Sequence, residues 1–164
     1  MRTSRAAALA LALAAGAAAI ACRPARPAVA PRPAAANDSL EGTIRVVGVE
    51  VIPVVTLAFE GVTPSLTLDG PASLRRVDGL RVAVTGHRNG ATLVVTRFVV
   101  VAANGVPATD GVLASEGAST VLVTADGVRH RLVNPPPLLR ENPGHRAWVS
   151  GPLDREPVAY GIIE

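Results

Sequence analysis

Three histidines are the side chains best suited to metal binding or acid–base catalysis, and they stand at positions 87, 130 and 145. Their spacings match none of the ligand patterns of zinc sites. His130 lies between Arg129 and Arg131, whose positive charges would repel a cation. We therefore predict surface histidines, with no bound metal and no cofactor. The run Arg129, His130 and Arg131 is kept as an alternative site for solute binding or hydrolysis.

The serines and carboxylates give little support for catalysis. No serine lies in a Gly-x-Ser-x-Gly turn, the motif that exposes a nucleophilic hydroxyl. The chain has no lysine, which excludes a phosphate-binding loop of the Gly/Lys type. Asp154 and Glu156 stand two positions apart in a predicted turn, where carboxylates are usually solvated rather than paired for glycoside hydrolysis. We predict that the protein is not an enzyme.

Cys22, the only cysteine of the chain, follows a basic start and an apolar run over residues 6–21. Sixteen residues are too few to span a bilayer comfortably as a helix, which needs about 20. A basic start, a short apolar run and small residues at its end are typical of a secretory signal peptide, predicted over residues 1–21. Residues 19–22 read "AIAC", which resembles the lipobox of bacterial lipoproteins. That resemblance implies a lipid attached to Cys22; the alternative is ordinary signal cleavage that leaves a free thiol.

Residues 22–37 are predicted to form a tether between this anchor and the folded part. Four prolines in the stretch exclude helix and favour extended polyproline II. The residue after Cys22 is Arg23 rather than Asp, which resembles the pattern of outer-membrane lipoproteins and implies that the protein faces the periplasm. The membrane is therefore one expected partner, through the lipid on Cys22.

Positive charge is concentrated outside the part predicted to fold. Five of the 16 arginines lie before residue 38, and the remaining 11 face all 13 acidic residues, a net charge of −2. A phosphate-binding protein is expected to carry a basic face on its folded domain. We therefore predict no nucleic-acid partner.

The folded part contains two similar segments. "GPASLRRVDGLRVAVTG" (70–86) and "PPPLLRENPGHRAWVSG" (135–151) share proline, leucine, arginine, valine and glycine positions at a constant offset of 65. Upstream, "LAFEGV" (57–62) is similar to "VTADGV" (123–128), and "EGTIRVVG" (41–48) to "DGVLASEG" (110–117). The order is kept throughout, so we predict an internal duplication with repeats over 38–104 and 105–164.

Each repeat is predicted to contain five short strands and a helical turn between the third and the fourth. Frequent Val and Thr, interrupted by Gly-containing turns, indicate strands. The fold class is therefore all-β. The "xRVxVxG" strand after a Leu-Arg turn resembles small bacterial envelope OB-fold proteins, which implies two five-stranded OB-like barrels. The alternative is a single β-sandwich or barrel of eight to ten strands. A unit of about 60 residues is marginal alone, so the repeats should fold together.

Strand alternation assigns the side chains around Trp148 to two faces. Arg146 and Trp148 should point out of the barrel, while Ala147 and Val149 point in. An outward Trp is either a packing anchor between the repeats or part of a partner-binding surface. The candidate binding residues are therefore Trp148, Arg146, Arg129, His130 and Arg131. The predicted function is a lipid-anchored envelope module that binds or assembles an envelope protein or glycan.

Overall fold

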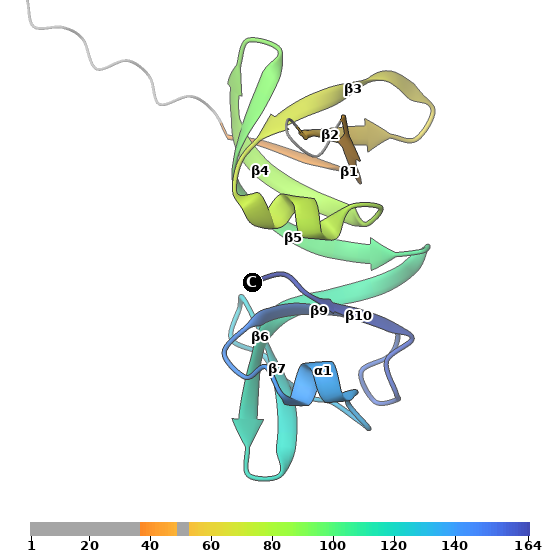
Figure 1. The fold of residues 1–164 in the computed structure, drawn as a ribbon, viewed down its shortest axis with the longest axis vertical. Helices are drawn as coiled ribbons and strands as arrows, with labels where there is room; N and C mark the ends of the chain where they lie inside the picture. The colour runs from red at the N-terminus through yellow and green to blue at the C-terminus, as the bar shows by residue number, and fades with distance from the viewer. Residues whose placement is uncertain (1–36, 49–52) are drawn as a thin grey trace, which may run out of the picture. The chain divides into compact units, whose positions relative to one another are not determined.

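The computed structural model describes residues 37–48 and 53–164, which we treat as one unit. Cys22, the predicted signal peptide and nearly all of the predicted tether lie outside the described residues. Ten strands and two one-to-two-turn helices make up the unit (Figure 1), which confirms the all-β fold class. The elements are β1 (Asp38–Val47), β2 (Val54–Phe59), β3 (Val62–Asp69), η1 (Ala72–Val77), β4 (Arg81–Asn89), β5 (Thr92–Ala103), β6 (Val106–Glu116), β7 (Ser119–Thr124), β8 (Arg129–Arg131), α1 (Pro137–Arg140), β9 (Arg146–Ser150) and β10 (Ala159–Ile162).

The first half, β1 to β5, forms a closed ring of strands. β1 pairs with β2 and β4, β2 pairs with β3, and β4 pairs with β5, all antiparallel. The ring closes where Thr67–Asp69 of β3 runs parallel to Thr92–Val94 of β5. The short 3₁₀ helix η1 connects β3 to β4, as the sequence predicts.

The second half, β6 to β10, repeats this pairing order and forms a partial ring. β6 pairs with β7 and β9, β7 with β8, and β9 with β10. Helix α1 connects β8 to β9, at the position that η1 takes in the first half. Among the pairings of the described residues, none joins β8 to β10, so the counterpart of the β3–β5 closure is missing.

The strand registers of the two halves agree with the offsets of the sequence repeat. Thr43 of β1 pairs with Arg81 of β4, and Val112 of β6 pairs with Arg146 of β9. Val112 lies 69 positions after Thr43, and Arg146 lies 65 positions after Arg81. These are the offsets of the matching sequence segments. The two halves therefore place the matched residues at equivalent points of their ladders, which supports the predicted repeat.

Two hydrogen bonds recur at these offsets. The Gly79 N–H donates to the carbonyl of Ile44 at 3.0 Å, and the Gly144 N–H donates to the carbonyl of Leu113 at 2.7 Å. Both glycines have a positive φ, of 79° and 84°, a conformation that a Cβ would strain. This explains why a glycine stands at the matched position of each repeat.

The two halves have separate apolar clusters. Val82 and Val84 of β4 are fully buried in the first cluster, and Ala147 and Val149 of β9 are buried in the second. The predicted inward faces of both strands are therefore confirmed. The short helix of each half adds a fully or almost fully buried leucine to its own cluster; these are Leu74 and Leu139.

Candidate functional site

The junction between the halves begins at a tight turn. Asn104 and Gly105 connect β5 to β6 with φ values of 50° and 78°, the left-handed pair that two-residue hairpin turns require. β5 and β6 then pair only at Ala102 with Pro107 and Ala103 with Val106. Beyond these pairs the two strands diverge, and side chains from both halves line the space between them.

Trp148 lies at this junction and is largely buried there. It points away from Ala147 and Val149, as expected, but only 9 % of it is exposed because it joins the apolar cluster of the first half. Ile163, fully buried, joins the same cluster. Of the two interpretations of an outward Trp, this placement is that of a packing anchor between the repeats. Trp148 is thus a core residue and not part of a solvent-exposed binding surface.

Arg146, the neighbour of Trp148 on the same face, forms an ion pair with Asp110. Its Nε donates to Asp110 Oδ1 at 2.9 Å and its Nη2 donates to Asp110 Oδ2 at 2.8 Å. The guanidinium also lies over the ring of Phe98, 4.4 Å from the centroid, a cation–π contact between the halves. The side chain of Arg146 is 23 % exposed and that of Asp110 is 5 % exposed. The candidate binding residue Arg146 therefore makes most of its contacts within the protein.

The ion pair also caps the edge of β5. Arg146 donates to the carbonyl of Phe98, and Asp110 accepts from the N–H of Val100 at 2.9 Å. A neighbouring strand would make the same two kinds of hydrogen bond to this edge. Two side chains of the second half therefore occupy the place of a strand beside the first half and hold the two halves in register.

The first half contains the equivalent ion pair in an exposed position. Glu41 and Arg81 stand at the offsets of 69 and 65 from Asp110 and Arg146, and their side chains meet at 2.7 Å. These side chains are 48 % and 50 % exposed. Sequence reasoning aligned all four residues but did not connect them as pairs. The signal was present, because each acid lies on a first strand that pairs with the fourth strand carrying its arginine.

A groove runs along the junction between β5 and the strands β6, β7 and β8. Its lining is mainly aliphatic, with Val99 from β5, Val112 from β6, Val123 from β7, and Val128 beside β8. Arg97 of β5 is exposed beside it. The part of the groove next to the Arg146–Asp110 pair has a volume of about 280 Å³.

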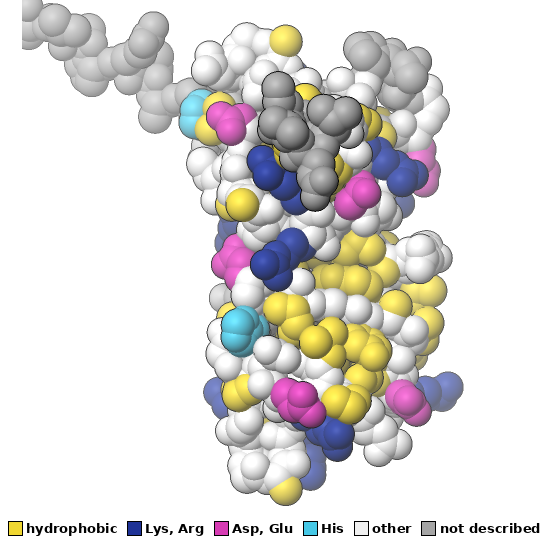
Figure 2. Space-filling model, in the orientation of Figure 1, with side chains coloured by type: hydrophobic (Ala, Val, Ile, Leu, Met, Phe, Trp, Pro, Cys, Tyr) yellow, Lys and Arg dark blue, Asp and Glu magenta, His cyan; other side chains and the backbone are white. Residues whose placement is uncertain are grey.

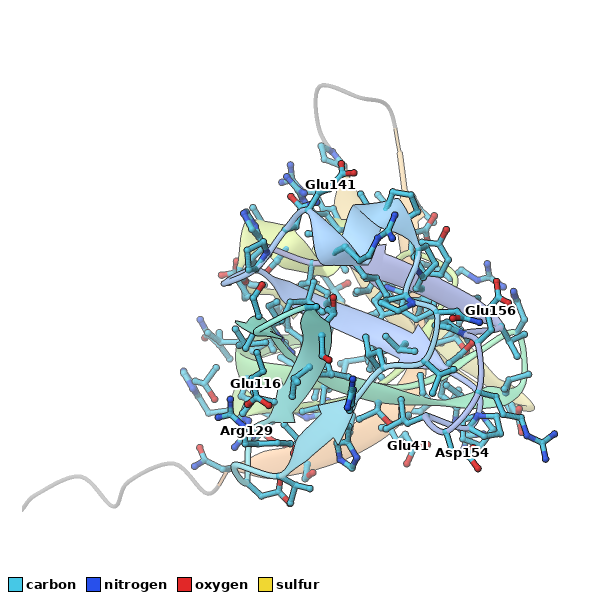
Figure 3. The ribbon with its side chains drawn as sticks, turned by 90° about the horizontal axis from the view of Figure 1, so that it is seen from below. Glu41, Glu116, Arg129, Glu141, Asp154 and Glu156 are labelled. Carbon is cyan, nitrogen blue, oxygen red and sulfur yellow. The ribbon has the colours of Figure 1, made fainter. Side chains whose placement is uncertain are left out.

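The side chains of β8 lie on two faces of the strand. Arg129 and Arg131 are exposed, whereas His130 is half-buried and lines the groove. Because neighbouring strand residues point to opposite faces, the two arginines lie on the face opposite to His130. Arg129 pairs with Glu116, its Nε donating to Oε1 at 2.7 Å, and Figure 3 shows these two side chains together.

Asp126, in the turn before β8, lines the groove together with His130. The hydroxyl of Thr124 and then the N–H of Val128 donate hydrogen bonds to its carboxylate, and these bonds lower the pKa of Asp126 below its ordinary value. Hydrogen bonds to the ionised form have this effect because they stabilise the anion. The carboxylate of Asp126 therefore adds a negative charge to the lining of the groove.

The other candidate groups are dispersed. Asp154 and Glu156 are exposed and lie apart in Figure 3. Nδ1 of His145 lies 2.8 Å from the carbonyl oxygen of Glu164. Within residues 37–48 and 53–164, no group of three His, Cys, Asp or Glu side chains is arranged to hold a metal ion. In the same part of the chain, no helix has the length and apolar character to cross a membrane.

Comparison with known proteins adds no relative: no family model, no curated protein and no solved structure matches this chain.

Proposed function

We propose that this protein is a lipid-anchored module of the cell envelope that binds or assembles a partner and has no catalytic activity. The sequence supports the location in the cell envelope, through the basic start, the short apolar run and the lipobox-like "AIAC" ending at Cys22. The aliphatic groove between the halves supports the binding role, because it is the hollow in which side chains of both repeats converge. The presence of Arg23 rather than Asp after Cys22 supports an outer-membrane position facing the periplasm.

We further propose that both halves are OB-like barrels. The support is the order of pairing in the first half, with β1 between β2 and β4 and a parallel closure of β3 on β5. A short helix between the third and fourth strands, and a repeat of the same order in the second half, agree with this proposal. OB barrels commonly bind extended ligands, which suits an envelope protein or glycan as the partner.

The groove is suited to binding more than to chemistry. Its most buried charged groups are Arg146 and Asp110. They form hydrogen bonds with each other and with the backbone edge of β5. The alternative, solute binding or hydrolysis at Arg129, His130 and Arg131, has less support because β8 directs His130 away from both arginines.

The anchor is tested by replacing the lipidated cysteine. Cys22→Ser should move the protein from the membrane to the soluble fraction, and intact-mass measurement of the wild type should show added lipid. A serine variant that stays in the membrane, together with a wild type without lipid mass, would contradict the anchor.

The groove is tested by a matched pair of valine variants. Val128, which lines the groove, and Val133, which is outside it, are 46 % and 40 % exposed. Val128→Asp should abolish binding to envelope proteins or glycans while Val133→Asp preserves it, as measured by pull-down from solubilised envelopes. Equal binding by both variants would exclude the groove as the site.

A further inference from the structure

The contact between the halves uses two different surfaces. The first half supplies the edge of β5, with Phe98 and Val100, which we name the receptor surface. The second half supplies the Asp110–Arg146 ion pair, which we name the clip. Because the halves are repeats, each half should carry an equivalent of both surfaces.

The ladders identify the second receptor surface. In the first half Phe98 and Val100 pair with Val84 and Val82, and in the second half Tyr160 and Ile162 pair with Val149 and Ala147. Val84 and Val82 correspond to Val149 and Ala147 at the repeat offset of 65. Tyr160 is therefore the second-half equivalent of Phe98, and Ile162 is the equivalent of Val100.

The backbone of β10 is oriented for the same contact. The N–H of Ile163 donates to the carbonyl of Arg146 at 2.7 Å, toward β9. Since successive residues of an antiparallel edge strand point their N–H groups in opposite directions, the N–H of Ile162 points away from β9. The N–H of Val100, its equivalent, points toward Asp110 in the same sense.

Within the described part of the chain, the second receptor surface and the second clip are both open to solvent. Tyr160 is 37 % exposed whereas Phe98 is 2 % exposed, and Val158, close to Tyr160 in sequence, is 67 % exposed. The equivalent clip, Glu41 with Arg81, is already formed and about half exposed. Figure 2 shows hydrophobic side chains gathered on the face that carries β9 and β10 in Figure 1.

We propose that a second copy of this chain docks head to tail, with the Glu41–Arg81 clip of one copy on the Tyr160 surface of the next. Arg81 would stack on the Tyr160 ring as Arg146 stacks on Phe98, and Glu41 would accept a hydrogen bond from the N–H of Ile162. The two patches are different, so the contact is heterologous and builds a ring or an open chain. The proposal rests on the assembly role proposed above and names its partner.

One position distinguishes this contact from the one inside the molecule. Ala83 is the first-half equivalent of Trp148. The contact between copies therefore lacks the aromatic anchor. It should therefore be weaker than the contact between the halves. Confinement of many copies on one membrane surface would raise their effective concentration and favour it.

Cross-linking of paired cysteine variants tests the proposal. In the full chain with Cys22→Ser, which removes the only cysteine, Ala83→Cys and Val158→Cys are made in separate chains and mixed in a mild detergent at about 1 mM, a concentration that replaces confinement on a membrane. A short bismaleimide should join the two variants when they are mixed and leave each unjoined alone. Arg88→Cys replaces Ala83→Cys as the control, because Arg88 lies on the same strand but outside the clip. Adding Arg81→Glu to the Ala83→Cys chain should reduce the cross-link about tenfold or more, since it reverses the charge of the clip.

The outcomes separate this proposal from the proposed function. Three outcomes would each overturn the head-to-tail contact. The Arg88→Cys control could cross-link to Val158→Cys with the same yield as Ala83→Cys, either single variant could cross-link with itself, or the mixture could give no cross-link. All of these chains lack the lipid, so failure here leaves the anchor intact, and failure of the Cys22→Ser fractionation leaves the cross-link unchanged.

Discussion

Removing Arg146 should destabilise this protein far more than removing its equivalent, Arg81. Among the described residues, Arg146→Ala would leave Asp110, whose side chain is 5 % exposed, with the N–H of Val100 as its remaining partner, and would remove the donor to the carbonyl of Phe98. Breaking a buried ion pair in this way costs about 3–5 kcal/mol. Because Arg146 is 23 % exposed and water can reach the vacated site, we expect the lower value, about 3 kcal/mol.

The matched variant Arg81→Ala removes the same interaction from the surface. Its ion pair with Glu41 is about half exposed, and pairs of this kind contribute about 0–1 kcal/mol. The two substitutions change the same residue type at equivalent positions of the repeat. The difference between them, about 2 kcal/mol or more, therefore measures what burial between the halves adds.

Urea unfolding followed by fluorescence is the assay. Trp148 is the only Trp of the chain and lies at the junction, so its emission reports the contact between the halves directly. With a denaturant slope of about 2 kcal/mol per molar, Arg146→Ala should lower the urea midpoint by about 1.5 M and Arg81→Ala by less than about 0.5 M. Equal shifts would refute the argument. So would additivity of Arg146→Ala with Asp110→Ala, because partners in one buried pair must couple.

Four other predictions concern the same unit. Trp148→Ala should cost about 3 kcal/mol or more in urea unfolding, since it empties a buried aromatic site; a cost below about 1 kcal/mol would contradict its role as the anchor. Gly161→Ala should cost about 1–3 kcal/mol, because the added Cβ would lie 2.7 Å from Trp148 Nε1, and an unchanged midpoint would show that the ring can move. Leu74→Ala and Leu139→Ala should each cost about 2–5 kcal/mol and shift one common unfolding transition in calorimetry; two separated transitions would show that the halves unfold independently. In a carboxyl NMR titration Asp126 should titrate below its ordinary pKa, so its stabilising contribution is present above the unfolded pKa and is lost as the pH falls through the folded one; an ordinary value would contradict the Thr124 hydrogen bond.

Local rules were enough to predict the strands and the two short helices. Val82 and Val84 alternate with Arg81 and Ala83 along β4, and this period of two fixes which side chains enter the core. The Gly79 and Gly144 positions were matched in sequence because both turns require a positive φ. Patterns of this kind depend on neighbours along the chain, so they can be read without the fold.

The candidate site was predicted only in part. Arg146 and Trp148 were assigned to the face opposite Ala147 and Val149, but alternation along a strand distinguishes faces and not what covers them. Asp110, Phe98 and Val100 were missed, because they lie 36 to 48 positions from Arg146 in the sequence and only the fold brings them together. Arg129, His130 and Arg131 were adjacent in sequence, yet strand geometry directs them to opposite faces.

The sequence by itself determined that the two repeats carry an acid and an arginine at equivalent positions, because it aligns Glu41 with Asp110 and Arg81 with Arg146. Only the tertiary structure decided that one pair is buried and the other exposed. The reason is that burial depends on which surface of one half meets the other, and the divergence of β5 and β6 after the turn at Asn104 sets that contact. The two repeats have similar sequences, but each is covered by the other on a different surface. Equivalent ion pairs therefore differ in their exposure to solvent.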